Sequence, residues 1–262
     1  MSAPFKGHFD QIGEGPPILC IPGFGSSNRI FRPLAERLKD RFCLILPDNR
    51  GMGQSPAAWK PYQLDDLAGD CLNLMDSLHH ERFAVIGLSM GGFVAQLLTL
   101  QAPQRVGALA LLCSTSGGEA FQQVFPSLSE EQVKGIYSLK AQARIEAALS
   151  PAICPLLKTR YPDVYQQVLG WRSREQENLP QIMLQYYAVS QFMANTVALE
   201  SITCPTLVMN GDTDLLVPLI NAEMLVERIP GAQLSVITET DHLFFLEKEQ
   251  EVAEKLGLFL GG

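Results

Sequence analysis

The order of short apolar runs along the chain constrains its fold more than any other feature. A strand that is apolar throughout is buried on both faces, so such runs are typical of a mostly parallel sheet with covered faces. We expect Phe5–Ile12 to be an antiparallel edge strand. Six further runs are bounded by Pro, Gly or polar residues and predict buried strands: Ile18–Ile21, Cys43–Leu46, Phe83–Ile86, Val106–Cys113, Thr206–Met209 and Leu234–Ile237.

Longer amphipathic segments separate these runs. Their apolar residues recur at helical spacing and so form one stripe along each segment. The alternation of strands with helices indicates an α/β fold in which helices cover both faces of the sheet. The predicted helices are Ile30–Leu38, Leu64–Leu78, Met90–Leu100, Ile220–Arg228 and Glu247–Leu260.

The alternation stops between about Gly117 and Ser201, where helical patterns follow one another without a convincing strand. A stretch of this length is too long for a simple loop. We therefore expect a helical cap, formed by residues 118–201, over one end of the sheet. The core is then made of two parts of the chain, residues 1–117 and 202–262.

Composition and charge exclude several kinds of partner and cofactor. The net charge is −8 and no run is rich in Lys or Arg, which argues against a nucleic-acid or membrane partner. The six cysteines form no CxxC pattern and no signal peptide is visible, so we expect reduced thiols in a cytoplasmic protein. Without a P-loop, a dinucleotide-binding GxGxxG or an HExxH motif, no cofactor and no metal are expected.

A G-x-S-x-G motif, Gly87-Leu88-Ser89-Met90-Gly91, lies between a predicted strand and a predicted helix. Glycines at these positions let the backbone turn sharply without Cβ clashes. Such a turn lifts the Ser89 hydroxyl above the sheet at a helix N-terminus, the position of a catalytic nucleophile. The alternative is an ordinary turn with no catalytic role.

A serine hydroxyl is a weak nucleophile and needs a neighbouring base. His242 follows the last predicted strand, so its loop lies at the carboxyl end of the sheet and can reach Ser89. We therefore expect His242 to be the base. The other histidines, His8, His79 and His80, lie near the N-terminus or at a helix end.

A carboxylate must orient the base and stabilise its charged form. Asp212 and Asp214 both follow the strand Thr206–Met209 and compete for this role. Asp212 directly follows a glycine, as a turn residue does, whereas Asp214 lies farther into the loop. We favour Asp214, which gives the chain order Ser89, Asp214, His242.

Two backbone N–H groups are needed to hold a tetrahedral oxyanion. One is expected to come from Met90, directly after the nucleophile. The other is expected from Phe24, in the glycine-rich loop after Ile18–Ile21. The alternative for this loop is a turn without function.

These motifs together resemble the α/β-hydrolase superfamily along the whole chain except the cap. The resemblance rests on Gly23-Phe24-Gly25, Asp48-Asn49-Arg50-Gly51-Met52-Gly53-Gln54-Ser55, Gly87–Gly92, Asp212-Thr213-Asp214 with Val217-Pro218, and His242. Arg50 and Ser55 are expected to be structural. The chain departs from many relatives in one position, because Pro22 stands where they carry a histidine; the backbone donor of Phe24 is kept.

The resemblance implies hydrolysis of a small carboxylic ester or lactone through an acyl-enzyme on Ser89. It is nearest to small, cap-bearing carboxylesterases, 3-oxoadipate enol-lactonases, carbon–carbon bond hydrolases and cofactor-free haloperoxidases. Relatives with an aspartate nucleophile, the haloalkane dehalogenases and epoxide hydrolases, are excluded by Ser89. The alternatives are that the same triad catalyses carbon–carbon bond hydrolysis or perhydrolysis, or that the fold is a ligand receptor with little turnover.

Overall fold

The protein is built around one seven-stranded sheet with the strand order β1-β3-β2-β4-β5-β6-β7. The computed structural model describes residues 5–150, 154–173 and 178–261. All strand pairs are parallel except β1 with β3. The strands are β1 (Phe9–Ile12), β2 (Pro17–Ile21), β3 (Cys43–Pro47), β4 (Phe83–Leu88), β5 (Val106–Leu112), β6 (Thr206–Gly211) and β7 (Gln233–Ile237).

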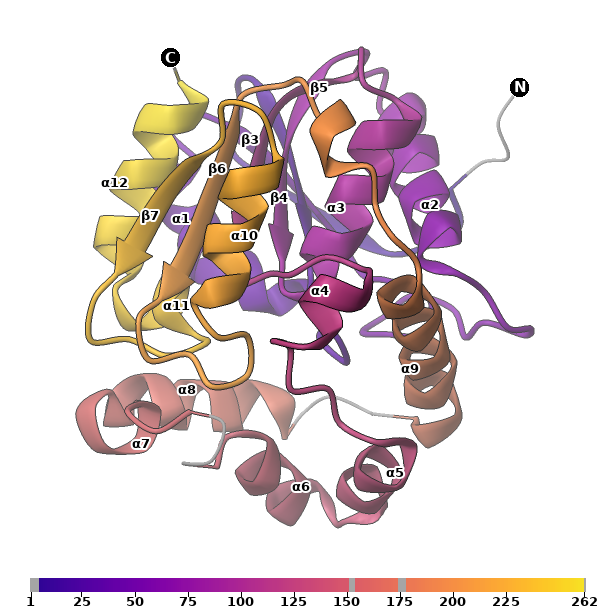
Figure 1. Ribbon diagram of the computed structural model, residues 1–262, viewed down its shortest axis with the longest axis vertical. Coiled ribbons are helices and arrows are strands. Elements are labelled where there is room, and N and C mark those ends of the chain that lie inside the picture. Colours follow the sequence, from indigo (N-terminus) through magenta and orange to yellow (C-terminus); the bar gives the residue numbers. More distant parts are fainter. Residues whose placement is uncertain (1–4, 151–153, 174–177, 262) are drawn as a thin grey trace.

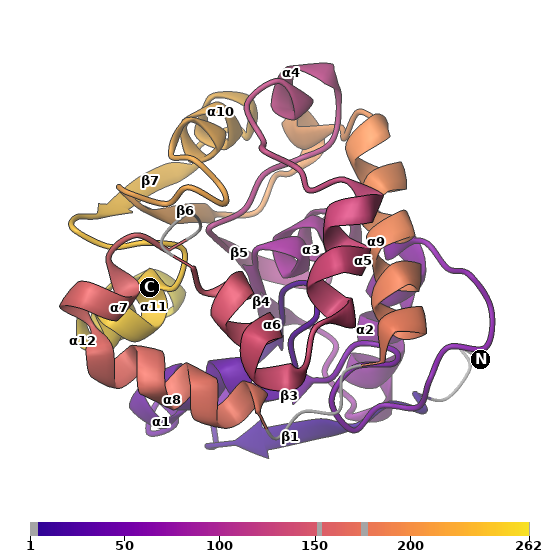
Figure 2. The same cartoon turned by 90° about the horizontal axis from the view of Figure 1, so that it is seen from below.

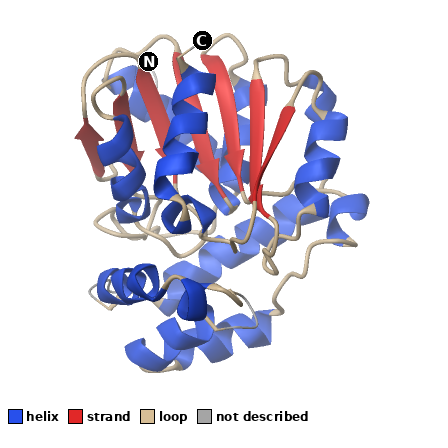
Figure 3. Ribbon diagram, turned by 90° about the vertical axis from the view of Figure 1, so that its left-hand side faces the viewer, coloured by secondary structure: helices blue, strands red, loops and turns tan. Residues whose placement is uncertain are grey.

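Helices cover both faces of this sheet, because successive residues of each central strand point to opposite sides. In β2, Leu19 and Ile21 belong to one buried cluster, whereas Ile18 and Cys20 belong to the other. Figure 3 shows the resulting layers of helix, sheet and helix. The first cluster is covered by α2 (Leu64–Ser77), α3 (Met90–Gln101) and α10 (Ile220–Arg228), and the second by α1 (Arg32–Leu38), α11 (Phe244–Glu247) and α12 (Glu249–Leu260).

The chain between β5 and β6 forms helices, and its described residues contain no strand. Helices α5 to α8 lie beyond the carboxyl ends of the strands, where Figures 1 and 2 show them spread across that edge of the sheet. This is the place expected for the cap, although the division at residues 118 and 201 stays a prediction. The segment comprises α4 (Glu119–Gln122), α5 (Glu130–Ser138), α6 (Ala141–Ala148), α7 (Leu157–Arg160), α8 (Pro162–Arg172), α9 (Leu179–Ala194) and the 3₁₀ turn η2 (Leu199–Ser201).

The predicted fold class, an α/β-hydrolase sheet with helices on both faces, is confirmed. One strand differs in burial: the run Leu234–Ile237, predicted to be buried, lies in the edge strand β7, where Leu234 is exposed and only Ile237 is fully buried. The other differences lie at element ends. The expected C-terminal helix, Glu247–Leu260, is α12, which begins two residues later because Lys248 has the non-helical dihedrals φ −126° and ψ 52°. The short helix α11 before it was not predicted. The first predicted helix starts with a 3₁₀ turn, η1 (Asn28–Phe31). Cys113, expected inside β5, directly follows it with a positive φ of 38°.

The cysteines and the helix lengths bear on two further expectations. All six cysteines are free thiols, and all but Cys204 are buried. Within the described ranges, no helix is both long enough and apolar enough to cross a membrane.

Candidate active site

Ser89 lies at the sharp turn where β4 ends and α3 begins. Its backbone has φ 53° and ψ −119°, outside the regions that a non-glycine residue normally adopts. Three hydrogen bonds hold this geometry: Ser89 N–H donates to the Leu112 carbonyl at 2.8 Å, and the Ser89 carbonyl accepts from Gly92 N–H at 2.8 Å and Ser114 Oγ at 2.9 Å. A conformation of this kind costs about 1–3 kcal/mol and persists only where the surroundings impose it.

The glycines of the motif allow α3 to approach the sheet closely. A Cβ atom on Gly91 would lie 2.0 Å from the Ile21 carbonyl oxygen, and one on Gly87 would lie 2.5 Å from the Gly91 carbonyl oxygen. Both distances are far below any real carbon contact. The spacing of the motif therefore has a packing reason at these two positions as well as a possible catalytic one at Ser89.

Asp214 and His242 form a buried pair on neighbouring loops. Asp214 Oδ2 lies 2.7 Å from His242 Nδ1, and the aspartate side chain has no exposed surface. Its other oxygen, Oδ1, accepts the backbone N–H groups of Leu216 and Val217, each at 2.8 Å. These three contacts fix the carboxylate in one orientation, so the imidazole it binds is fixed as well.

Asp212, the competing carboxylate, is placed elsewhere. It is exposed, and its Oδ1 accepts Thr240 N–H at 3.2 Å. The structure thus brings Asp214 to His242 and leaves Asp212 at the surface of the same loop.

The environment of His242 changes the pKa of its imidazole in two opposing ways. Burial disfavours the charged ring, whereas the carboxylate of Asp214 favours it, and the pKa ends well above its ordinary value. Because Nδ1 is occupied by Asp214, Nε2 is the ring nitrogen that can accept a proton from another group.

One cavity of about 530 Å³ contains both Ser89 and His242 in its wall. Phe24 and Met90, the two expected oxyanion donors, line it too. The remaining wall is mainly apolar and comes largely from the helices and loops between β5 and β6, through residues such as Phe125, Val133, Ile136, Leu149, Val168, Val189 and Met193.

The loop that carries Phe24 lies directly against the nucleophile turn. A Cβ on Gly23 would be 3.3 Å from Ser89 Cβ and 3.9 Å from Ser89 Oγ. The N–H of Met90 is the first of α3 and has no acceptor within the helix. For the Phe24 N–H, no hydrogen bond is found within the described part of the chain. Both donors therefore lie at the cavity without an internal partner.

Cys113 is a neighbour of this site that the sequence did not single out. Its Sγ, a carboxylate oxygen of Asp214 and a ring nitrogen of His242 lie within 4.8 Å of one another. Burial raises the pKa of the thiol, which keeps it protonated. These three groups are possible metal ligands, but a metal would have to break the 2.7 Å contact between His242 and Asp214, and we assign none. The β5 run predicted only that Cys113 is buried.

Asp241, next to His242, connects the site to the helices above the sheet. Its buried carboxylate accepts the N–H groups of Leu156 and Leu157, at 2.8 and 2.9 Å, at the start of α7. The other carboxylate oxygen of Asp241 accepts a hydrogen bond from Thr213 Oγ1 at 3.1 Å, and Thr213 directly precedes Asp214. Asp241 thus links the loops of His242 and Asp214 to α7. No sequence pattern reveals a contact between residues so far apart in the chain.

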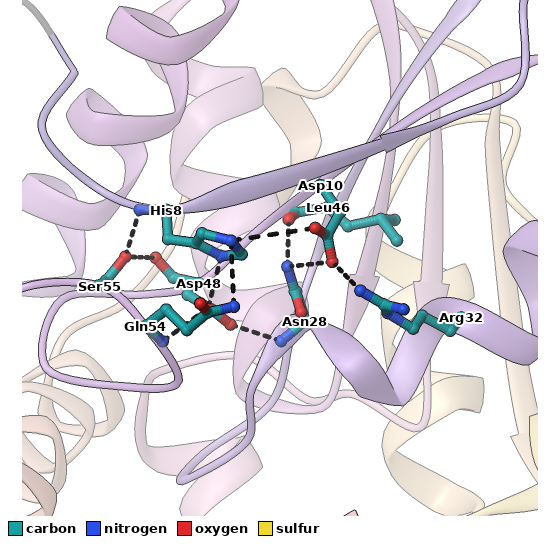
Figure 4. Close-up of polar contacts among 8 residues, drawn as sticks. All are labelled: His8, Asp10, Asn28, Arg32, Leu46, Asp48, Gln54 and Ser55. Carbon is teal, nitrogen blue, oxygen red and sulfur yellow. Dashed lines mark hydrogen bonds and ion pairs between the residues drawn. The ribbon is translucent and has the colours of Figure 1, made fainter.

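The Asp48 turn, residues 48–55, follows β3, and its described residues do not line the cavity. Figure 4 shows its polar contacts. Asp48 accepts the backbone N–H groups of Asn28 at 2.7 Å and Gln54 at 2.9 Å, and it contacts His8 Nδ1 at 3.0 Å. Ser55 Oγ donates to the Asp48 carbonyl at 2.7 Å. These bonds tie the edge of the sheet to the loop after β3.

Arg50, in the same turn, forms an ion pair with Asp70 of α2. Neither Arg50 nor Ser55 lines the cavity. Both therefore fit the structural role expected of them.

Comparison with known proteins places the chain in a family. The family model for the alpha/beta hydrolase fold matches residues 16–151, about half of the chain. The matched segment includes the loop of Phe24, the Asp48 turn and the Ser89 motif. The chain belongs to the alpha/beta hydrolase fold family.

Individual relatives are similar along nearly the whole chain. A poly(3-hydroxyalkanoate) depolymerase of Ectopseudomonas oleovorans is 28% identical over 93% of this chain and 84% of its own length. A pimeloyl-[acyl-carrier protein] methyl ester esterase of Chromobacterium violaceum is 26% identical over 94% of this chain and 95% of its own. The solved structure of an enol-lactonase from Burkholderia xenovorans LB400 shares the fold, with a TM-score of 0.84, 23% identity, and coverage of 97% of this chain and 96% of that one.

Proposed function

We propose that this protein is a serine hydrolase that cleaves a small carboxylic ester or lactone through an acyl-enzyme on Ser89. The observation that carries the proposal is the pairing of His242 Nδ1 with the buried carboxylate of Asp214 at 2.7 Å, on the same cavity as Ser89. A strained serine at a strand-to-helix turn is the other element of this chemistry. The names of the depolymerase and the methyl ester esterase point to the same bond type.

In the proposed mechanism, His242 Nε2 takes the proton of Ser89 as its oxygen attacks the substrate carbonyl. The N–H groups of Met90 and Phe24 hold the oxyanion of the tetrahedral intermediate. His242 then gives the proton to the leaving alkoxide, which departs as an alcohol and leaves an acyl group on Ser89. Water, deprotonated by His242, attacks the acyl group. The bond to Ser89 Oγ then breaks, His242 returns the proton to this oxygen, and the acid is released. Asp214 stays ionised and stabilises the imidazolium in both halves of the reaction.

The cavity supports an ester with a substantial apolar part. Its volume of about 530 Å³ is in the range of small-molecule sites, which are typically apolar with a few polar groups near the reacting bond. Here the polar groups Ser89 and His242 share the wall with aromatic and aliphatic side chains. This supports an uncharged reacting ester group flanked by hydrocarbon.

Labelling with a fluorophosphonate probe followed by mass spectrometry tests the proposal. We expect a single adduct on Ser89 in the wild type and none in Ser89→Ala, with a loss of ester turnover of about a thousandfold or more, because the residues of a triad act as a unit. Ser190→Ala is the matched control, since Ser190 lines the same cavity but donates to the Tyr186 carbonyl on α9. Labelling at another residue, or substantial turnover by Ser89→Ala, would contradict the assignment.

A further inference from the structure

The cavity wall differs in charge from the protein as a whole. Within the described residues that line it, no aspartate or glutamate is present, and Arg172 is the only arginine or lysine. The protein as a whole carries a net charge of −8. Among the described lining residues, the Arg172 guanidinium is therefore the one arginine or lysine charge that a bound substrate would meet.

Arg172, in the last turn of α8, makes few polar contacts within the described part of the chain. Its Nη2 donates to Ser26 Oγ at 3.3 Å, and no carboxylate of the described residues pairs with it. A guanidinium has five N–H donors, so most of its capacity is left over. The arginines that do pair with a carboxylate are Arg32 with Asp10, Arg37 with Glu249, Arg50 with Asp70, Arg105 with Asp76 and Arg160 with Glu239.

The contact with Ser26 fixes where this charge lies relative to the reaction. Ser26 is two residues beyond Phe24, its N–H donates to the Gly23 carbonyl at 3.2 Å, and it lines the cavity itself. The Arg172 guanidinium therefore lies beside the loop that is proposed to hold the oxyanion. A substrate group bound to Arg172 would lie on the Phe24 side of the Ser89 hydroxyl.

We propose that Arg172, with the hydroxyl of Ser26, binds a carboxylate carried by the substrate, so that the protein prefers esters or lactones with an anionic end. This inference rests on the proposed function of the Ser89 site. A guanidinium matches the geometry of a carboxylate in a two-point contact. The one arginine among the described lining residues, with no lysine beside it, balances the single charge of a carboxylate but not the double charge of a phosphate monoester.

Two matched substrates test the preference. Mono-p-nitrophenyl adipate and p-nitrophenyl hexanoate differ only in a terminal carboxylate against a methyl group. The wild type should have the higher kcat/KM on the adipate, with the difference shrinking as salt is added. Arg172→Gln should lower the ratio of the two kcat/KM values by about 10- to 100-fold, the loss expected for charge-assisted hydrogen bonds.

A control variant removes a positive charge from the same group of helices without touching the cavity. Lys140, the N-cap residue of α6, is exposed and does not line the cavity. Lys140→Gln should keep the wild-type ratio. An unchanged ratio in Arg172→Gln, or an equal fall in both variants, would overturn the inference. If Arg172→Gln does not fold, the same ratio is measured for Arg172→Lys. This variant keeps the charge but loses the two-point contact, so it should lower the ratio by less than the Gln variant; an unchanged ratio would overturn the inference.

Binding measurements separate this inference from the proposed function. Adipate binding is measured by calorimetry to Ser89→Ala and to Ser89→Ala/Arg172→Gln. If neither ester is hydrolysed, the proposed function fails, yet adipate binding that is lost in the double variant still supports the anion site. If the hexanoate ester is hydrolysed through Ser89 but the ratio of the two kcat/KM values is the same in Arg172→Gln as in the wild type, the proposed function stands and the anion site is wrong. Equal adipate binding by both variants also overturns the site.

Discussion

At the residue scale, two aspartates of one loop have contrasting surroundings. Asp214 is buried and makes contacts through both oxygens, two of them from backbone N–H groups and one with His242. Asp212 is exposed and accepts a single backbone N–H. A mechanism that depends on a fixed, charged partner for the base can use the first and not the second.

Asp214→Asn should lower kcat by about a thousandfold or more without unfolding the protein. The asparagine oxygen can keep the bonds from Leu216 and Val217, which turns its amide nitrogen toward His242 Nδ1. That nitrogen is a donor, so Nδ1 must accept and Nε2 must carry the proton, which prevents it from acting as a base. Steady-state kinetics on a neutral ester measure the loss, and Asp212→Asn is the control that should stay close to wild type.

The dependence of activity on pH is a second test of Asp214→Asn. The pKa of His242 is held above its ordinary value by Asp214, and activity requires the neutral ring, so activity should rise with pH through that raised pKa. Without the carboxylate charge, the acidic limb of residual activity should move to lower pH. A limb that does not move would mean that another group titrates there.

At the element scale, the approach of α3 to β2 depends on the absence of a side chain at Gly91. Gly91→Ala would place a methyl group 2.0 Å from the Ile21 carbonyl oxygen, a contact that only a shift of α3 or β2 can relieve. We expect a loss of unfolding free energy of at least about 3 kcal/mol, measured by urea denaturation.

A second helix supplies the control for this substitution. Gly69 lies inside α2, and a Cβ there would meet nothing within 4 Å. Gly69→Ala should therefore raise stability by about 0.5–1 kcal/mol, because alanine loses less backbone entropy than glycine. Equal changes in unfolding free energy for the two substitutions would show that the close approach at Gly91 does not affect stability.

The sequence predicted most elements because their local signals agree with the fold. The runs in β2, β3 and β6 are apolar on both faces, and α10 was predicted with the bounds that it has. The short helix α11 was missed because four residues carry too little periodicity, and α12 was predicted two residues early because the non-helical backbone of Lys248 leaves no pattern in the sequence. The strand order was not predicted, since it depends on which crossovers pass over which strands.

At the scale of the whole molecule, the cavity is what sequence alone could not supply. Patterns along the chain predicted Ser89 and His242 as candidates and a helical cap over one end of the sheet, but not which residues of that segment line the cavity. Arg172 meets Ser26 across 146 residues, and Gln185 Oε1 accepts Gly25 N–H across 160. Contacts of this length are set by the fold and leave no local periodicity.

The same packing buries two acidic groups beneath the site. Asp241 N–H donates to Glu247 Oε2 at 2.8 Å, while Glu247 Oε1 has no hydrogen-bond partner within the described residues. Burial, followed in smaller measure by the charges of Asp241 and Asp214, raises the pKa of Glu247 to about 7. Burial also raises the pKa of Asp241.

These shifts make stability depend on pH with a definite sign. Between the ordinary glutamate pKa and about 7, the folded protein holds a proton on Glu247 that the unfolded chain has lost. Deprotonation therefore favours unfolding, and the contribution of Glu247 to stability is present at acidic pH and is lost as the pH rises to about 7. Asp241 acts in the same direction.

Glu247→Gln should remove this dependence while keeping an acceptor for Asp241 N–H. Urea denaturation at pH 5 and pH 8 gives the unfolding free energy of each protein. The difference, variant minus wild type, should increase by roughly 2 kcal/mol from pH 5 to pH 8, because only the wild type gains a buried charge. Glu254→Gln, on the exposed side of α12, should show no such change. A constant difference between Glu247→Gln and wild type would mean that Glu247 titrates at its ordinary pKa and that water or a neighbouring donor compensates its charge in the folded protein.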